Sequence, residues 1–300
     1  MLLEPTSTFY LFALMAAVAF GLDSVLQKRG LSHGGTPLQG TFITLMINVV
    51  VYWAVTLAWN NGTAGLYQTV PNWILILLFV GGLLPMLNFL FAYTAVDRLG
   101  ASIHISVFHS NRQLLIFLFG MIFLNEFFSL MVLFGILGIA VGLSILPLSG
   151  GGDLGGWELW EVIFSLVAAL CIAIGDVFIH YVLISTEATV LETISVYRTG
   201  ALLAISTYIL YVNYELITSI PKQALFFFFM SGTSLTVALL FLFTAYDRGP
   251  VAIASALSGT APLLTVVFTA LFSRDLERVT TLLYVGAGAI VLGVVLITLG

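Results

Sequence analysis

The stretch that decides the fold occurs twice. Phe91-Ala92-Tyr93-Thr94-Ala95-Val96-Asp97-Arg98 recurs 150 residues later as Phe241-Leu242-Phe243-Thr244-Ala245-Tyr246-Asp247-Arg248. Each copy ends one apolar run and precedes another. Further out, Asp23 in the first apolar run matches Asp176 in the sixth. Because a membrane protein built from two such halves usually has its substrate site where they meet, the repeat favours a transporter.

The composition places this chain in a membrane. Of its 300 residues, 60% are hydrophobic and 8% are charged, whereas soluble domains carry roughly 25% charged residues. We therefore expect a multi-pass integral protein of the cell membrane, with lipid as a partner. The net charge of −5 includes no basic stripe, so a nucleic-acid partner is not expected. The single cysteine excludes an internal disulfide.

The apolar runs predict an all-α fold with ten transmembrane helices. A spanning helix needs about 20 mainly apolar residues. Runs of this length cover roughly 8–27, 38–59, 72–96, 101–124, 128–148, 158–184, 190–212, 223–246, 251–273 and 280–299. The glycine-rich linker 149–156 divides the chain into two five-helix repeats, 1–148 and 157–300. Because each half has an odd number of spans, the two repeats are expected to be inverted.

Basic residues give a first prediction of orientation. Arg248 is alone on the side of the predicted bundle where both termini lie, and the other cations flanking the spans lie opposite, at Lys28, Arg29, Arg98, Lys222, Arg274 and Arg278. The positive-inside rule would put this second group in the cytoplasm and both termini outside.

The two halves resemble the ten-helix, EamA-type branch of the drug/metabolite transporter superfamily. The most specific stretch is Ala261-Pro262-Leu263, followed by Glu277, Gly286 and Gly293, which is similar to the pattern of helices nine and ten in that family. The first half repeats it through Leu124-Asn125-Glu126 but has Arg112-Gln113 where Pro-Leu is expected. The resemblance implies a small-molecule permease, often an exporter of amino acids or other metabolites, usually with cytoplasmic termini.

Four charged residues stand well inside predicted spans. They are Asp23, Arg112, Asp176 and Arg198. Insertion scales put the cost of a central Asp or Arg at about 2.5–3.5 kcal/mol, so each needs a partner, a wet cavity or a function. Two acids and two bases balance, so structural ion pairs are one interpretation, and a lining role in a substrate site is the other.

The fourth predicted helix carries the largest polar load. At about 100° per residue, His104, Phe108, Asn111 and Arg112 share one face. Lipid cannot satisfy these groups, so that face is expected to look into the protein or into water. Arginine suits a carboxylate or a phosphate, because its planar fork donates two parallel hydrogen bonds.

Asp176 and His180 are neighbours at i, i+4 on the sixth predicted helix. They could exchange a coupling proton, since histidine titrates near neutral pH, or form a helix-end hydrogen bond. Asp23 is a further coupling candidate. The buried amides Asn48 and Asn88 could contact substrate or hold helices together. The predicted substrate-binding set is Asp23, Asn48, Asn88, Tyr93, His104, Phe108, Asn111, Arg112, Asp176 and Arg198.

Other motifs point to packing or are missing. Glycines in the fifth and tenth predicted helices, Gly135, Gly138, Gly142, Gly286, Gly288 and Gly293, predict close-packed faces. No His or Cys pair has metal spacing, no phosphate-binding loop is present and no nucleophile elbow occurs, so we expect no metal, no cofactor and no catalysis.

The preferred hypothesis is a secondary transporter that moves a small polar metabolite, anionic or zwitterionic, by alternating access as an exporter. Arg112 would hold the anionic group, and Asp23 or Asp176 would hold an ammonium or a proton. A multidrug exporter of organic cations is one alternative, although Arg112 would repel cations. A membrane enzyme acting on lipid-linked groups and a non-transporting scaffold are others. A monomer is the favoured state.

Overall fold

The computed structural model describes residues 7–59, 70–99, 101–145, 159–212, 215, 219–272 and 281–299, and in these residues the chain forms helices and no strand. The first half contains α1 (Ser7–Ser32), α2 (Pro37–Trp59), α4 (Asn72–Gly81), α5 (Leu83–Leu99), α6 (Ala101–Leu124) and α7 (Leu130–Ile145). The second half contains the short η2 (Leu159–Glu161) and then α8 (Val162–Ser185), α9 (Val190–Val212), α11 (Lys222–Tyr246), α12 (Val251–Ser258), α13 (Ala261–Phe272) and α14 (Thr281–Leu299).

These described helices make ten spans, which confirms the sequence prediction. α4 and α5 together form one span interrupted at Gly82, and α12 and α13 form another. The second break has a covalent cause: Pro262 lacks an N–H, and its ring clashes with the carbonyl four residues earlier, at Ser258, where α12 ends. In the first half Arg112-Gln113 replaces the Pro-Leu pair, and α6 runs unbroken.

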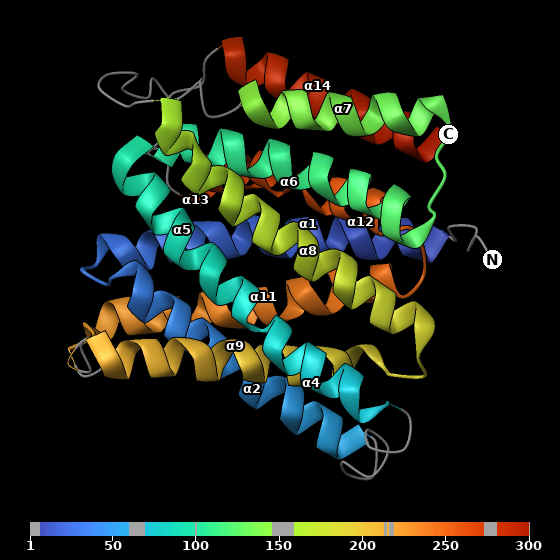
Figure 1. Ribbon diagram of the computed structural model, residues 1–300. Coiled ribbons are helices and arrows are strands. Elements are labelled where there is room, and N and C mark those ends of the chain that lie inside the picture. Colours follow the sequence, from blue (N-terminus) through green and yellow to red (C-terminus); the bar gives the residue numbers. More distant parts are fainter. Residues whose placement is uncertain are drawn as a thin grey trace.

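The two halves run through the bundle in opposite directions. α1 begins at the edge where both chain ends lie, whereas α8 begins at the opposite edge (Figure 1). The packing is reciprocal: α1 packs on α11 as α8 packs on α5, and α6 packs on α8 as α13 packs on α1. The equivalent helices α2 and α9 pack on each other, as do α7 and α14. The predicted inverted repeat is therefore confirmed.

Glycines bring α7 and α14 into backbone contact. A Cβ added to Gly135 would lie 2.7 Å from the carbonyl oxygen of Gly293, and one added to Gly142 would lie 2.7 Å from that of Gly286. Both contacts need the absence of a side chain. The prediction is wrong for Gly288, where an added Cβ would meet no atom of the described residues within 4 Å, because this residue is exposed.

The arginine of the repeated Asp-Arg sequence makes the same kind of contact in both halves. The guanidinium carbon of Arg98 lies 5.3 Å from the ring centre of Phe164 in α8, and that of Arg248 lies 4.6 Å from the ring centre of Phe12 in α1. Arg98 also forms a 3.3 Å ion pair with Glu161. Each arginine thus places a cation over an aromatic ring near one end of the first helix of the other half.

The four consecutive phenylalanines at the start of α11 divide between lipid and core. Phe226 is 59% exposed on the apolar outside of the bundle. Phe228 is buried, and its ring fills a space left by three glycines near the α1–α2 turn. A Cβ added at Gly30, Gly35 or Gly40 would lie 2.4, 2.5 or 2.9 Å from this ring. The close contact joins the end of α1 and the start of α2 to α11.

Candidate functional site

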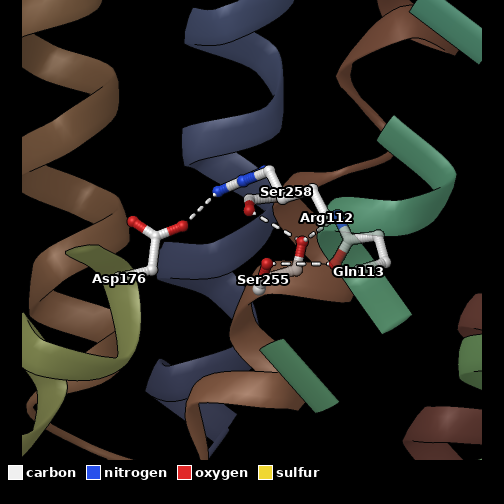
Figure 2. Close-up of polar contacts among 5 residues, drawn as sticks. All are labelled: Arg112, Gln113, Asp176, Ser255 and Ser258. Carbon is white, nitrogen blue, oxygen red and sulfur yellow. Dashed lines mark hydrogen bonds and ion pairs between the residues drawn. The ribbon is translucent and has the colours of Figure 1, made fainter. Parts of the chain in front are cut away.

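An ion pair joins the two halves near the middle of their long helices. Nη2 of Arg112 in α6 donates to Oδ2 of Asp176 in α8 at 2.7 Å, and the side chains are 11% and 10% exposed (Figure 2). The phenol group of Tyr246, at the end of α11, interacts electrostatically with both. Each charge offsets much of the desolvation cost of the other, so the pair is less costly to bury than either charge alone.

Gln113, the next residue on α6, holds α12 against the pair. Its Nε2 donates to the carbonyl oxygen of Ser255 at 2.9 Å, and the Ser255 hydroxyl donates to Oε1 of Gln113 at 3.0 Å (Figure 2). The hydroxyl of Ser258 donates to the same carbonyl at 3.0 Å. A Cβ at Gly259 would lie 2.0 Å from Nε2 of Gln113, so this position must be glycine for the contact to form. Sequence reasoning missed Gln113 and Ser255.

A second polar cluster lies between α1, α2 and α11. The hydroxyl of Ser231 donates to Oδ1 of Asp23, which is 6% exposed. Nδ2 of Asn48 donates to Oγ1 of Thr236 at 2.7 Å. Among the described residues, no cation lies within ion-pair distance of Asp23. The cluster therefore holds helices together through hydrogen bonds and contains a carboxyl group without a counter-charge in the described part.

Arg198 in α9 is a buried cation of a different kind. It is 9% exposed, its guanidinium carbon lies 5.8 Å from the ring centre of Tyr197, and it interacts electrostatically with Tyr52. No carboxylate of the described residues lies within 4 Å of it. A Cβ at Gly175, beside Asp176, would lie 2.4 Å from the Tyr197 hydroxyl. Tyr197, whose ring lies beside Arg198, therefore packs directly on α8.

The remaining predicted site residues are dispersed. Nδ2 of Asn111 donates to the carbonyl oxygen of Val107 in its own helix at 2.8 Å, and the ring of Phe108 lies edge-on to that of His109. Asn88 is 8% exposed in α5. The predicted contacts of Tyr93 and His104 lie outside the part of the chain whose side chains the structure describes.

His180 does not contact Asp176, its neighbour one turn earlier. Its Nδ1 lies 2.6 Å from the carbonyl oxygen of Tyr246, and its Nε2 lies 3.4 Å from Oε1 of Glu126. Oε1 of Glu126 also accepts the backbone N–H of Val251 at 2.7 Å. In the sequence, Glu126 stood out only as the counterpart of Glu277 in the second half. Sequence spacing does not indicate that His180 and Val251 are its partners.

An apolar cavity of about 520 Å³ opens between α6 and α8. It is lined by Phe119, Phe123, Leu124, Ile174, Val177, Phe178 and Tyr181. The exposed position of Phe123, at 66%, places this cavity on the lipid-facing side, and its lining offers no charge to a polar solute. No group of three potential metal ligands occurs in the described residues.

The comparisons place this architecture in a family. The model of the EamA-like transporter family matches the chain twice, over residues 7–147 and 159–299. The chain belongs to the EamA-like transporter family. One solved crystal structure of a protein matches this EamA-like chain with a TM-score of 0.77 and 17% identity, covering 99% of each chain, which shows a shared fold. The comparison with curated proteins gives no match. The chain is thus a multi-pass membrane protein of a drug/metabolite transporter family.

Proposed function

We propose that this EamA-like chain is a secondary transporter of a zwitterionic metabolite of amino-acid type, working by alternating access. The observation that carries the proposal is the buried ion pair of Arg112 and Asp176 between the halves. Opening such a pair without compensation leaves two buried charges, each at a cost of several kcal/mol. A zwitterion can replace both partners at once, with its carboxylate on Arg112 and its ammonium on Asp176.

Other substrate classes fit the same pair less well. An organic cation would satisfy Asp176 and leave Arg112 uncompensated, and a simple anion would do the reverse. The acidic residues are scattered and form no cluster that could serve as the active site of a membrane enzyme acting on lipid-linked groups, so we propose no catalysis.

Export and a location in the cell membrane are proposed on family likeness alone. Asn48 and Asn111 already bond within the protein, so we assign them a structural role.

The test is flux into proteoliposomes, with a panel of zwitterionic amino acids, dicarboxylates, phosphate esters and organic cations. We expect wild-type flux of a zwitterion. Arg112→Ala and Asp176→Asn should each lower it by more than tenfold, which corresponds to about 1.4 kcal/mol of lost binding in the transported state. Arg98→Gln, which removes an arginine at the membrane edge, is the matched control and should leave the flux unchanged.

Three results would contradict the proposal. Flux of organic cations alone would support the multidrug alternative. Zwitterion flux that survives Arg112→Ala would remove the pair from the binding site and leave it as scaffold. Chemical conversion of a lipid-linked group by the purified protein, without transport, would show an enzyme.

A further inference from the structure

The contact between His180 and Glu126 requires a proton between the two side chains, as the hydrogen-bond partners of the imidazole ring show. The two side chains are 4% and 7% exposed, so water does not mediate between them freely. Nδ1 of His180 faces the carbonyl oxygen of Tyr246 at 2.6 Å. A carbonyl oxygen only accepts, so Nδ1 must carry a hydrogen.

That assignment fixes the other ring nitrogen. In a neutral ring with a hydrogen on Nδ1, Nε2 is an acceptor, and it would face the acceptor Oε1 of Glu126 at 3.4 Å. Two buried acceptors repel each other. The contact is favourable only if a proton lies between them, either on Nε2 as an imidazolium beside a carboxylate or on the carboxyl group as a donor to Nε2. Both arrangements contain the same single proton.

Glu126 is held in place for this contact. Its backbone N–H donates to the carbonyl oxygen of Gly120 at 3.1 Å, after Asn125 turns the chain with a left-handed φ of 53°. A Cβ at Gly120 would lie 2.6 Å from Oε2 of Glu126, so glycine leaves room for the carboxyl group. Oε2 is buried and has no hydrogen-bond partner among the described residues. Oε1 receives the N–H of Val251, the first residue of α12.

The neighbouring charges do not replace this proton. On α8, Asp176 is already compensated by Arg112 of α6. At the end of α11, Asp247 interacts with both Arg248 and His180. Glu192 at the start of α9 accepts hydrogen bonds from Thr189 of its own turn. Further titratable groups on α8 or on the elements beside it are Tyr181, Glu187, Tyr197, Arg198 and Tyr246; the described residues of α12 and α7 contain none.

We propose that Glu126 and His180 form a proton-binding site that joins the first half of the chain to the start of α12. A proton taken from water on the side of the termini restores the contact, and its release to water on the opposite side, in the other access state, leaves a neutral imidazole against a carboxylate. The repulsion then separates Glu126 from His180 and frees the start of α12. Given the proposed function, this site couples a proton to transport, in place of the Asp176 and Asp23 sites that the sequence suggested.

Spectroscopy of the full-length protein in nanodiscs tests the site without any substrate. Nitrogen NMR of labelled histidines, at about pH 7.5 and thus above the ordinary histidine value of about 6.5, should show His180 as an imidazolium, or infrared spectra should show a protonated carboxyl group. His180→Gln assigns the ring signals. Glu126→Gln should abolish either signature, because its amide donates to Nε2 permanently. A neutral His180 without a protonated carboxyl group would overturn the proposal.

Cysteine labelling tests the consequence for α12. In a Cys171→Ser background, Ala252→Cys places one buried thiol beside Val251. Its reaction with a maleimide should increase more steeply with pH than in the same protein carrying Glu126→Gln, which mimics the protonated contact. Glu161→Gln is the control and should behave as the parent. Equal pH dependence with and without Glu126→Gln would exclude gating of α12. Because no solute is added, these failures differ from a failure of the flux test.

Discussion

Arg112 and Asp176 show how buried charge acts at the scale of single residues. Removing one partner leaves the other uncompensated, so Arg112→Leu and Asp176→Leu should each destabilise the folded protein by about 3–5 kcal/mol. The double variant should be close to the parent, because two apolar side chains can replace a buried pair at little cost. Unfolding in detergent, measured as a double-mutant cycle, checks this coupling.

The exposed pair of Arg98 and Glu161 is the control for that cycle. Arg98 is 43% exposed, so solvent screens its 3.3 Å contact. Its removal should cost about 0–1 kcal/mol. Additive effects of the two single changes at Arg112 and Asp176 would contradict the account of the central pair.

Asp247 gives a prediction for pH. It lies just beyond α11, where burial raises the pKa of its carboxyl group from 3.8, with Arg248 and His180 acting in the opposite direction. A raised pKa means that the fold favours the protonated form, so stability is lost as pH rises through the folded-state value. Asp247→Asn should therefore melt slightly above the parent at neutral pH. Melting temperatures at a series of pH values should show the difference vanish in acid; a difference that grows in acid would contradict it.

At this scale the sequence predicts which residues need a partner but not which partner they find. Hydropathy marks Arg112 and Asp176 as costly, and helical spacing suggests Asp176 with His180. The structure pairs Arg112 with Asp176 and His180 with Glu126 instead. These contacts cross 64 and 54 positions in the sequence, where only the tertiary packing decides.

At the scale of helices, backbone contact between α7 and α14 sets the tolerance to side chains. Gly142→Ala puts a Cβ 2.7 Å from a carbonyl oxygen and should destabilise the protein by about 1–3 kcal/mol, as overpacking does. Gly288→Ala in α14 meets no described atom within 4 Å and should be neutral or stabilising, because alanine favours helix by up to about 1 kcal/mol. Thermal unfolding of both variants compares them, and equal effects would show that the contact is not tight.

The helix boundaries were predictable because long apolar runs and Gly/Pro breaks are local signals. The breaks within two spans, at Gly82 and before Pro262, were not predicted. The face of each helix was less predictable, since a span that is apolar all round gives no periodicity. Gly288 should have been left out of the packing face on spacing alone, because it lies about 200° around the helix from Gly286, whereas Gly286 and Gly293 share a face and both meet α7.

The whole molecule has one further testable property, its orientation. The spans from α1 to α8 are even in number, so Ser7 and Ser185 lie on the same side of the membrane. The span α9 follows before Gln223, which therefore lies on the other side. Single cysteines are placed at these positions in a Cys171→Ser background and treated with an impermeant maleimide in intact cells. The cysteines at positions 7 and 185 should either both react or both be protected, and the cysteine at position 223 should behave in the opposite way. The charge distribution predicts reaction at Ser7 and Ser185. Reaction at Gln223 alone would mean that the termini are cytoplasmic, as is usual for the family, and reaction at Ser7 and Gln223 together would contradict the topology.

The unbroken α6 opposite the broken α12 and α13 has a thermodynamic consequence. In the proposed cycle, the two access states exchange the conformations of the halves, and identical halves would make these states equal in free energy. Here one half carries Arg112 and Gln113 where the other carries a proline break. The resting equilibrium is therefore biased towards one side of the membrane, and every 1.4 kcal/mol of inequality shifts it tenfold. In the proposed cycle, the asymmetric sequence thus sets which face of the membrane the empty protein opens to most of the time.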